Sequence, residues 1–290
     1  MPNTLYRGRF APSPSGPLHL GSLLAATASY LDAKAQQGEW MVRIEDIDPP
    51  REKAGASDAI LQALIDHGLR WDGEVMYQSQ RSAAYDQALA RLIQEDALFY
   101  CTCTRAELQG HPVYPGTCRE QRSAPESLAA WRLRADDSVQ HWRDGLQGPQ
   151  QWSMLDVGDT ILKRKDGLYA YQLAVVVDDH AQGITHVVRG IDLLDSTPRQ
   201  LYLYQRLGWQ PPAFSHIPVI LDAHGNKLSK QNHANPINPA NAAHNLRRCL
   251  AWLGQATPPS DAASVEAILR FAVAHWQPMA IAGHRDIALA

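Results

Sequence analysis

Apolar and polar residues at positions 4–100 follow two alternating patterns. Short apolar and aromatic runs such as Leu5–Phe10 predict buried strands, whereas stretches such as Ser22–Lys34 have the pattern of helices. Strands that alternate with helices are typical of an α/β fold, in which helices cover both faces of a parallel sheet. The predicted elements are strands at 5–10, 40–45 and 98–100 and helices at 22–34, 56–67 and 83–96.

Residues 101–180 interrupt this alternation. The stretch up to position 150 is rich in cysteine, proline, glycine and arginine, with short strand-like pieces such as Ala130–Arg134. Thr160–Leu162 and Tyr169–Tyr171 predict a hairpin that turns through Lys165–Gly167. We interpret the whole stretch as a subdomain inserted into the α/β fold.

The sheet-like pattern resumes near the end of the insertion. It predicts strands at 173–179, 185–190 and 215–221, a helix at 197–207, and two final helices at 239–253 and 262–276. The last segment is too short to form another full domain. The predicted organisation is a first half of the main domain at 1–100, the insertion at 101–180, the second half at 181–235 and a short helical segment at 236–290.

Composition and charge restrict the class of protein. The 290 residues are 45% hydrophobic and 20% charged, which is ordinary for a globular protein with a real core. No apolar run approaches the ~20 residues that a membrane-spanning helix needs, and the N-terminus has no signal-peptide pattern. We therefore expect a cytoplasmic protein without a membrane partner, and a monomer, because no coiled-coil pattern is present. The net charge of −3 gives no basic footprint for nonspecific nucleic-acid binding.

Two short stretches carry the clearest chemistry. Pro17–Ser22 follows the first strand and leads into a helix, whose unpaired N–H groups and positive dipole end suit a phosphate. Lys227–Gln231 places two lysines three residues apart in a loop, where ammonium groups can reach a polyphosphate. Each stretch alone also fits a structural turn or a solvated basic loop. Together they resemble the HIGH and KMSKS signatures of class I aminoacyl-tRNA synthetases, with Ser22 in place of the last histidine and Gln231 in place of the last serine.

Further stretches narrow this resemblance. The chain resembles glutamyl-tRNA synthetases over roughly residues 5–235, in the stretches 9–16, 43–48, 171–179 and 188–193. That family carries a large anticodon-binding region after the lysine loop, and the printed sequence lacks one. The combination resembles the glutamyl-Q tRNA(Asp) synthetases, a truncated paralogue family that attaches glutamate to the queuosine base in the anticodon loop of tRNA(Asp). The resemblance implies a Rossmann-like class I catalytic domain.

Several of the matching residues also suit glutamate chemically. Glutamate carries two carboxylates and one ammonium, so its site needs two cations and one anion. Arg9 and Arg189 can form forked hydrogen bonds to carboxylates, while Glu45 can pair with the ammonium. Taken alone, each of them also fits a surface ion pair or a turn carboxylate. By resemblance, and with Tyr171 adding a hydroxyl, the L-glutamate site consists of Arg9, Phe10, Ala11, Pro12, Ser13, Glu45, Tyr171 and Arg189.

The expected reaction is the ATP-dependent activation of glutamate to an adenylate. The α-carboxylate attacks the α-phosphorus of ATP and expels pyrophosphate, so alignment and positive charge lower the barrier. His19 and Lys230 are the expected catalytic residues, because they offer a donor and a cation to the phosphates. The expected ATP site consists of His19, Gly21, Lys227, Ser229 and Lys230, with Mg²⁺ bridging phosphate oxygens. The adenylate then passes its glutamyl group to a nucleophile on RNA.

Three of the four cysteines form a cluster in the insertion. Cys101, Cys103 and Cys118 lie close together in the chain, whereas Cys249 falls on an apolar helix face. In a reducing compartment such clustering favours a metal over disulfides, and one structural Zn²⁺ would need a fourth ligand. Chemistry alone selects His111 as that ligand, whereas the family pattern implies Tyr114. Free structural cysteines are the alternative.

Three functions remain open from the sequence. The first is the glutamyl-Q type of enzyme, whose partners are L-glutamate, ATP and tRNA(Asp) that carries queuosine. The second is a small glutamyl- or glutaminyl-tRNA synthetase that charges a 3′-terminal adenosine. The third is a catalytically silent RNA-binding paralogue, against which the presence of His19, Glu45, Arg189 and Lys230 argues.

Overall fold

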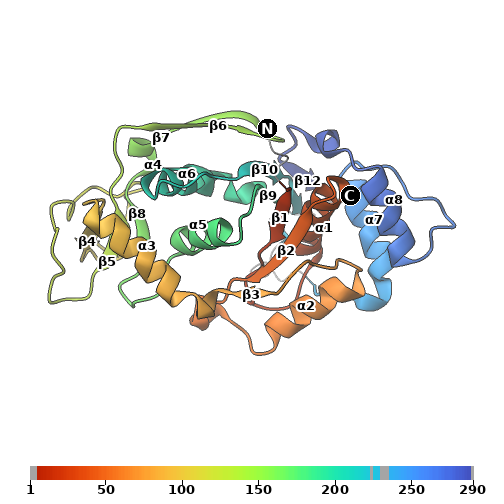
Figure 1. Ribbon diagram of the computed structural model, residues 1–290, viewed down its shortest axis with the longest axis horizontal. Helices are drawn as coiled ribbons and strands as arrows, with labels where there is room; N and C mark the ends of the chain where they lie inside the picture. The colour runs from red at the N-terminus through yellow and green to blue at the C-terminus, as the bar shows by residue number, and fades with distance from the viewer. Residues whose placement is uncertain (1–4, 223–224, 229–234, 289–290) are drawn as a thin grey trace.

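The computed structural model describes residues 5–222, 225–228 and 235–288 (Figure 1). Parallel strands lie in the middle of an elongated molecule, with an antiparallel region at one end and two C-terminal helices at the other. One large hydrophobic cluster surrounds α1 (Leu20–Ala35), and a second surrounds α5 (Tyr171–Ala181). The chain therefore has two large cores, one on each side of the parallel strands.

The parallel strands form the predicted α/β core. They are β1 (Arg7–Phe10), β2 (Glu39–Ile44), β3 (Met76–Tyr77), β9 (His186–Gly190) and β10 (Ala213–Ile217). β2 pairs with β1 and β3, and β9 pairs with β10, all in parallel. The amide of Thr185, just before β9, donates to the carbonyl of Arg7 at 2.9 Å, which sets β9 beside β1. Trp40, Val42 and Ile44 lie on one face of β2 and are fully buried, which places that face against the core around α1.

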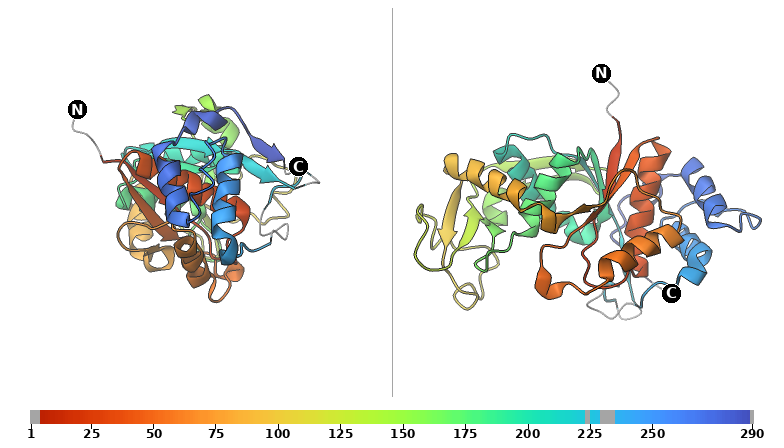
Figure 2. Two further views of the ribbon diagram at one scale, coloured as in Figure 1. Left: turned by 90° about the vertical axis from the view of Figure 1, so that its right-hand side faces the viewer. Right: turned by 60° about the horizontal axis from the view of Figure 1, so that its bottom comes forward.

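The helix α1 is covered on opposite sides. It packs against β1 and β9, and also against α7 (Ala242–Trp252) and α8 (Val265–Ala274), which lie in front of it in Figure 2, left. α2 (Ala56–Asp66) contributes Ile60 and Leu64 to the same core. The two predicted C-terminal helices are therefore confirmed, and their apolar faces complete the core around α1.

The antiparallel region contains the strands of the predicted insertion and also the strand predicted at 98–100. This strand was expected in the parallel sheet of the first half but pairs in antiparallel with a strand of the insertion. β4 (Leu98–Cys101), β5 (Ala130–Leu133) and β8 (Thr160–Lys163) form one antiparallel sheet. β6 (Val139–Asp144) and β7 (Gly148–Ser153) form a hairpin, which leads into the short helix α4 (Met154–Val157). The predicted hairpin after β8 is confirmed only in part. The amide of Ala170 donates to the carbonyl of Leu162 at 2.9 Å, but Tyr171 already begins α5.

The predicted strand at 173–179 is wrong, because these residues belong to the helix α5. The run from Leu173 to Val177 is entirely apolar, and a buried helix cannot be distinguished from a buried strand by such a run. α5 packs against α3 (Ser82–Gln94) and α6 (Thr197–Arg206), so all sides of this segment are covered. The domain boundary predicted at position 180 stays a prediction.

The predicted strand at 215–221 is divided in two by Pro218. The first part belongs to β10, and the second forms β11 (Val219–Leu221), which pairs in parallel with β12 (Asp286–Ala288). Proline has no N–H to donate to a ladder, which explains the interruption. Among the described helices, none combines the length and apolar character needed to cross a membrane.

Candidate active site

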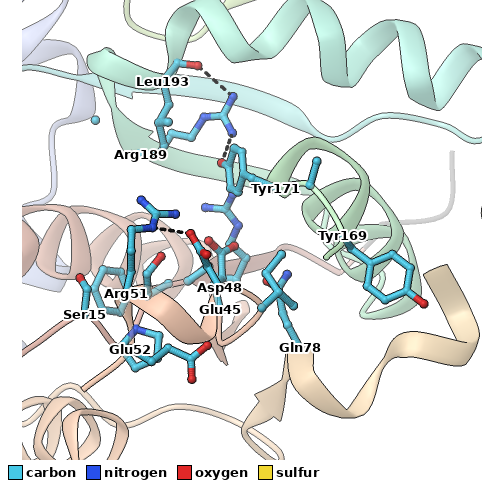
Figure 3. A pocket seen from close by; sticks show the side chains of 18 of the residues that line it. Ser15, Glu45, Asp48, Arg51, Glu52, Gln78, Tyr169, Tyr171, Arg189 and Leu193 are labelled. Atoms are coloured by element: carbon cyan, nitrogen blue, oxygen red, sulfur yellow. Dashed lines mark hydrogen bonds and ion pairs between the residues drawn. The ribbon is translucent and has the colours of Figure 1, made fainter. Parts of the chain in front are cut away.

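A cavity of about 620 Å³ opens at the carboxyl ends of the parallel strands (Figure 3). Its wall includes the turns that follow β1 and β2. These turns are joined where the amide of Glu45 donates to the carbonyl of Pro12 at 3.0 Å. Ligands of open parallel sheets bind at this edge. The cavity wall contains the predicted residues Arg9, Phe10, Ala11, Ser13, Glu45, Tyr171 and Arg189.

A buried network of opposite charges forms one side of the cavity. The guanidinium of Arg43 is fully buried and lies 2.7 Å from Asp179 and 3.6 Å from Glu45. Asp179 also lies 3.4 Å from Nε of Arg9. Burial opposes the ionisation of Asp179, but Arg43 and Arg9 outweigh burial and hold the pKa of this carboxyl below its usual value. Arg9 is therefore positioned by an ion pair at the cavity wall.

Glu45 is a carboxylate whose charge the protein stabilises poorly. Its side chain is only 8% exposed. Burial raises its pKa to about 7, and the attraction of Arg43 and Arg9 offsets only part of this effect. An additional cation beside Glu45 would restore the charged form. The ammonium group of an amino acid is such a cation, which fits the role predicted for Glu45.

Arg189 extends from β9 and is fixed by several hydrogen bonds. Its Nε donates to Nε2 of His216 at 3.0 Å, and its Nη2 donates to Oγ1 of Thr197 at 2.9 Å. Nη2 also donates to the carbonyl of Leu193 at 3.3 Å, and Nη1 donates to the hydroxyl of Tyr171 at 3.4 Å (Figure 3). Burial lowers the pKa of Arg189, yet a guanidinium remains charged in proteins. The side chain is thus positioned before any ligand binds.

Asp144 in turn positions His216. Both side chains are fully buried, and the carboxylate of Asp144 accepts a hydrogen bond from Nδ1 of His216. Because Nδ1 carries the proton, Nε2 is free to accept from Arg189. Burial lowers the pKa of His216, which keeps the ring neutral beside this guanidinium. The carboxylate is fixed by the backbone amides of Leu146 and Gln147, each at 3.0 Å.

A second cavity of about 500 Å³ shares a wall with the first and is lined by His19, Gly21 and Lys227 of the predicted ATP site. His19 caps α1 by accepting from the amide of Ser22 at 3.3 Å. A Cβ added at Gly21 would lie 3.1 Å from both the His19 ring and the carbonyl oxygen of Leu228, so a side chain there would push these segments apart by a few tenths of an ångström. The histidine turn therefore lies next to Leu228, near the start of the lysine stretch. Lys227 forms an ion pair with Asp192 in the same wall.

Most of the predicted ligand residues are brought together by these two cavities. Pro12 lines the second cavity rather than the first, together with His19, Gly21 and Lys227. Ser13 lines both. Ser229, Lys230 and Gln231 lie outside the described residues, so the roles predicted for Ser229 and Lys230 stay predictions.

The three clustered cysteines also meet in space. The sulfurs of Cys101, Cys103 and Cys118 lie within 4.8 Å of one another. The Tyr114 hydroxyl lies 3.4 Å from the sulfur of Cys101 and 3.7 Å from that of Cys103. Burial opposes ionisation of Cys118, but hydrogen bonds from Tyr114 and Thr102 lower its pKa to about 7. Among the described residues this group of metal-type ligands consists of three thiols, and the predicted alternative His111 is not part of it.

Comparisons with known proteins identify the family. A family model for the catalytic domain of class I tRNA synthetases (E and Q) matches residues 6–245. A glutamyl-Q tRNA(Asp) synthetase from Chromobacterium violaceum is 51% identical over an alignment of 285 residues, and the match covers 95% of this chain and 95% of the relative. A relative of the same name from Salmonella typhi is 50% identical and covers 97% of this chain and 95% of its own. The chain belongs to the glutamyl-Q tRNA(Asp) synthetase family of class I.

Solved structures agree with this placement. A glutamate tRNA ligase from Elizabethkingia meningosepticum, crystallised with its amino acid, superposes with a TM-score of 0.81 at 26% identity. The superposition covers 98% of this synthetase and 67% of that ligase. The glutamate-tRNA synthetase of Elizabethkingia anophelis gives a TM-score of 0.82 at the same identity. The class I catalytic fold predicted from the sequence is therefore confirmed.

Several residues of the site in this synthetase were not predicted from the sequence. Arg43 and Asp179 lie within stretches that carried the family resemblance, but neither was assigned a role. The position of Arg43 within an apolar run was a signal, because a charged residue that is buried there needs a partner. Asp179 follows the end of such a run and gave a weaker signal. His216 and Asp144 gave no such signal, since they lie 72 residues apart and meet only in the folded chain.

Proposed function

We propose that this synthetase activates L-glutamate with ATP and transfers the glutamyl group to the queuosine base of tRNA(Asp). The observation that carries the proposal is the convergence of Arg9, Glu45 and Arg189 on one cavity, next to the cavity of the histidine turn. Two guanidiniums and one poorly stabilised carboxylate match the two carboxylates and the ammonium of glutamate. The names of the 50–51% identical relatives supply the acceptor.

In the first step, an oxygen of the glutamate α-carboxylate bonds to the α-phosphorus of ATP. The bond from this phosphorus to the bridging oxygen breaks, and pyrophosphate leaves. Mg²⁺ bound together with ATP would stabilise the charge of the phosphates. His19 and the first turn of α1 donate hydrogen bonds to the phosphates, and Lys227 and Lys230 neutralise the departing charge. Gly21 allows the nucleotide to lie close to the backbone.

In the second step, a nucleophile of the modified base attacks the carbonyl carbon of the glutamyl-adenylate. The bond from that carbon to the phosphate oxygen breaks, and AMP leaves. The mixed anhydride is already reactive, so the protein needs only to position the two reactants.

The cysteine cluster is proposed to hold one structural Zn²⁺. The donor set fits this ion, because three thiolates and one oxygen or nitrogen ligand complete a tetrahedral site. The position of the Tyr114 hydroxyl beside the sulfurs of Cys101 and Cys103 supports this residue as the fourth ligand. The ion would hold the 101–118 loop against β4 and β5 and would take no part in the chemistry.

Mapping the acceptor tests the proposal directly. The enzyme is incubated with ATP, labelled glutamate and tRNA(Asp) with or without queuosine, and the labelled nucleotide is identified after RNase digestion. Label on queuosine supports the proposal, whereas label on the 3′-terminal adenosine would establish the conventional synthetase instead. Absence of both label and glutamate-dependent ATP–pyrophosphate exchange would favour the catalytically silent paralogue. We also propose that the enzyme is a cytoplasmic monomer.

A further inference from the structure

The cavity beside Arg189 is larger than glutamate requires. Cavities of about 300–1,000 Å³ enclose drug-sized ligands, and a free amino acid is much smaller than these. The 620 Å³ cavity extends from the glutamate residues to Asp48, Arg51, Glu52 and Gln78. In Figure 3, Glu52 and Gln78 lie across the cavity from Arg189. This second part of the wall, called here the outer wall, contains none of the residues predicted to hold glutamate.

Two hydrogen-bond acceptors of the outer wall lack donors. Among the described residues, Oε1 of Glu52 and Oε1 of Gln78 are buried without any hydrogen-bond partner. Gln78 is fully buried, and its Nε2 donates to Asp178 at 3.0 Å. Since a carboxylate can only accept, this contact fixes the amide orientation and leaves Oε1 as the unpaired atom. A buried acceptor without a donor is costly, so the outer wall is suited to a ligand that brings N–H groups.

The charge of the outer wall specifies the ligand further. Asp48 is already paired with the guanidiniums of Arg51 and Arg164, whereas Glu52 lies near the carboxylates of Asp46 and Asp48. Burial raises the pKa of Glu52 and these neighbouring carboxylates raise it further, while a hydrogen bond from the backbone of Asp48 offsets only part of the increase. A cationic N–H donor would relieve both effects at once. The ligand is therefore expected to carry a positive charge.

Queuosine has this chemistry. It is a 7-deazaguanine nucleoside whose side arm contains a secondary ammonium, which offers a positive charge and N–H donors. We propose that the outer wall is the subsite for the acceptor nucleoside, where Glu52 pairs with the ammonium of the queuosine arm and Gln78 accepts an N–H of the same nucleoside. The proposal rests on the proposed function and gives the larger part of the cavity its occupant.

The substitution Glu52→Gln tests the ion pair, because it removes the charge and keeps the shape. Transfer of labelled glutamate is measured against the concentration of queuosine-containing tRNA(Asp), and glutamate-dependent ATP–pyrophosphate exchange is measured in parallel. We expect the KM for this tRNA to rise at least about tenfold, as for the loss of a charged hydrogen bond. The KM for glutamate in exchange is expected to change far less. The matched control is Glu74→Gln, an exposed residue outside both cavities, which should change neither value.

Free nucleosides test the same contact without the rest of the tRNA. Queuosine and 7-deazaguanosine, which lacks the cationic arm, are compared as inhibitors of transfer. The wild-type enzyme should prefer queuosine, and Glu52→Gln should lose most of this preference. An equal preference in both enzymes would overturn the subsite.

The outcomes separate this proposal from the proposed function. If the wild-type enzyme labels queuosine and Glu52→Gln leaves the KM for tRNA unchanged, the subsite is wrong and the function stands. If the wild-type enzyme exchanges pyrophosphate but labels only the terminal adenosine, the function is wrong. In that case the nucleoside comparison still decides whether the outer wall binds the cationic arm.

Discussion

Arg189 is held by His216, Thr197 and Tyr171, so a substitution there removes a positioned cation rather than a mobile one. We expect Arg189→Ala to lower glutamate-dependent ATP–pyrophosphate exchange at least about 100-fold, because a forked charge-assisted contact is lost. Arg189→Lys keeps the charge without the fork and should recover only part of the activity. Near-normal exchange by the alanine variant would remove Arg189 from the glutamate site.

The pKa of Glu45 predicts how glutamate binding depends on pH. The carboxylate must be charged to pair with the substrate ammonium, and its pKa of about 7 means that the charge is lost as the pH falls through 7. At pH 6 only about a tenth of the enzyme is then competent, so the KM for glutamate should rise roughly tenfold relative to pH 8. Exchange kinetics between pH 5.5 and 8.5 measure this effect. A KM that stays constant across this range would contradict the assignment.

The pKa of Glu45 also predicts how folding stability depends on pH. Stability should fall as the pH rises, whereas glutamate binding should improve. Because folding raises the pKa of Glu45 from 4.5 to about 7, the folded state favours the protonated form. The associated stability is fully present below about pH 4.5 and is lost as the pH rises through 7. Without glutamate, Glu45→Gln should therefore unfold at a higher temperature than the wild type at pH 8, while activating glutamate poorly. Equal unfolding temperatures at pH 8 would mean that the carboxylate is well stabilised.

Lys230 falls outside the described residues, and its role is predicted from the sequence alone. As the second lysine of the loop, it is expected to neutralise the leaving pyrophosphate in the transition state. Lys230→Ala should lower the rate of adenylate formation sharply and leave glutamate affinity nearly unchanged. Single-turnover kinetics and glutamate binding by calorimetry separate the two effects. A loss of glutamate affinity equal to the loss of rate would place Lys230 in the glutamate site instead.

At the scale of elements, the hairpin of β6 and β7 supports the site from outside. Asp144 ends β6 and fixes the proton of His216 on Nδ1, so that Nε2 can accept from Arg189. Asp144→Asn would present an N–H to Nδ1 and favour the other tautomer, which turns a donor toward the donor of Arg189. We expect the KM for glutamate to rise roughly tenfold or more, while the KM for ATP stays within about twofold.

A purely structural role would change both constants together and would lower stability without changing selectivity. The control is Asp137→Asn, an exposed residue at the start of the same hairpin segment, which should change neither constant. Equal losses for glutamate and ATP would contradict a positioning role for Asp144.

The elements also show where sequence patterns are informative. β2 and α1 follow directly from their patterns and flanking turns, and the structure places both as predicted. α5 does not, because the five apolar residues from Leu173 fit a strand and a buried helix equally well. The two aspartates near the end of α5 did not help to distinguish a helix from a strand. Asp178 and Asp179 are adjacent and both buried, and each is neutralised by an arginine from another element, which a single sequence cannot reveal.

At the scale of the whole molecule, the residues that line the glutamate cavity could be predicted from the sequence. Arg9, Glu45 and Arg189 stand at strand ends, and the carboxyl ends of parallel strands meet at one edge, so their convergence could be expected. The residues that position them could not be predicted, since Arg43, His216 and Asp144 act through contacts that depend on how separate elements pack. The outer wall of the cavity likewise depends on β3 and the turn after β2 lying side by side.

The cysteine cluster lies at the far end of the molecule from α1, so its contribution concerns stability rather than catalysis. When the free Zn²⁺ concentration is about 1,000-fold above the Kd of the site, zinc binding adds about 4 kcal/mol to the free energy of unfolding. Loss of the ion should then lower the unfolding temperature of this part of the molecule by about 10 °C.

Cys118→Ala is expected to retain under about 0.2 zinc per chain, against about one in the wild type. Cys249→Ala is the matched control, because this thiol is buried in the core around α1 and should not change the zinc content.

The fourth ligand can be decided with the same measurement. The hydroxyl of Tyr114 contacts the sulfurs of Cys101 and Cys103, whereas His111 is not part of the cluster. Tyr114→Phe should therefore weaken zinc retention against a chelator, and His111→Ala should leave it unchanged. The reverse result would make the imidazole the ligand and would require the loop that carries it to turn inward. Wild-type protein that holds no zinc when purified without chelator would instead leave these cysteines as free thiols packed against β4.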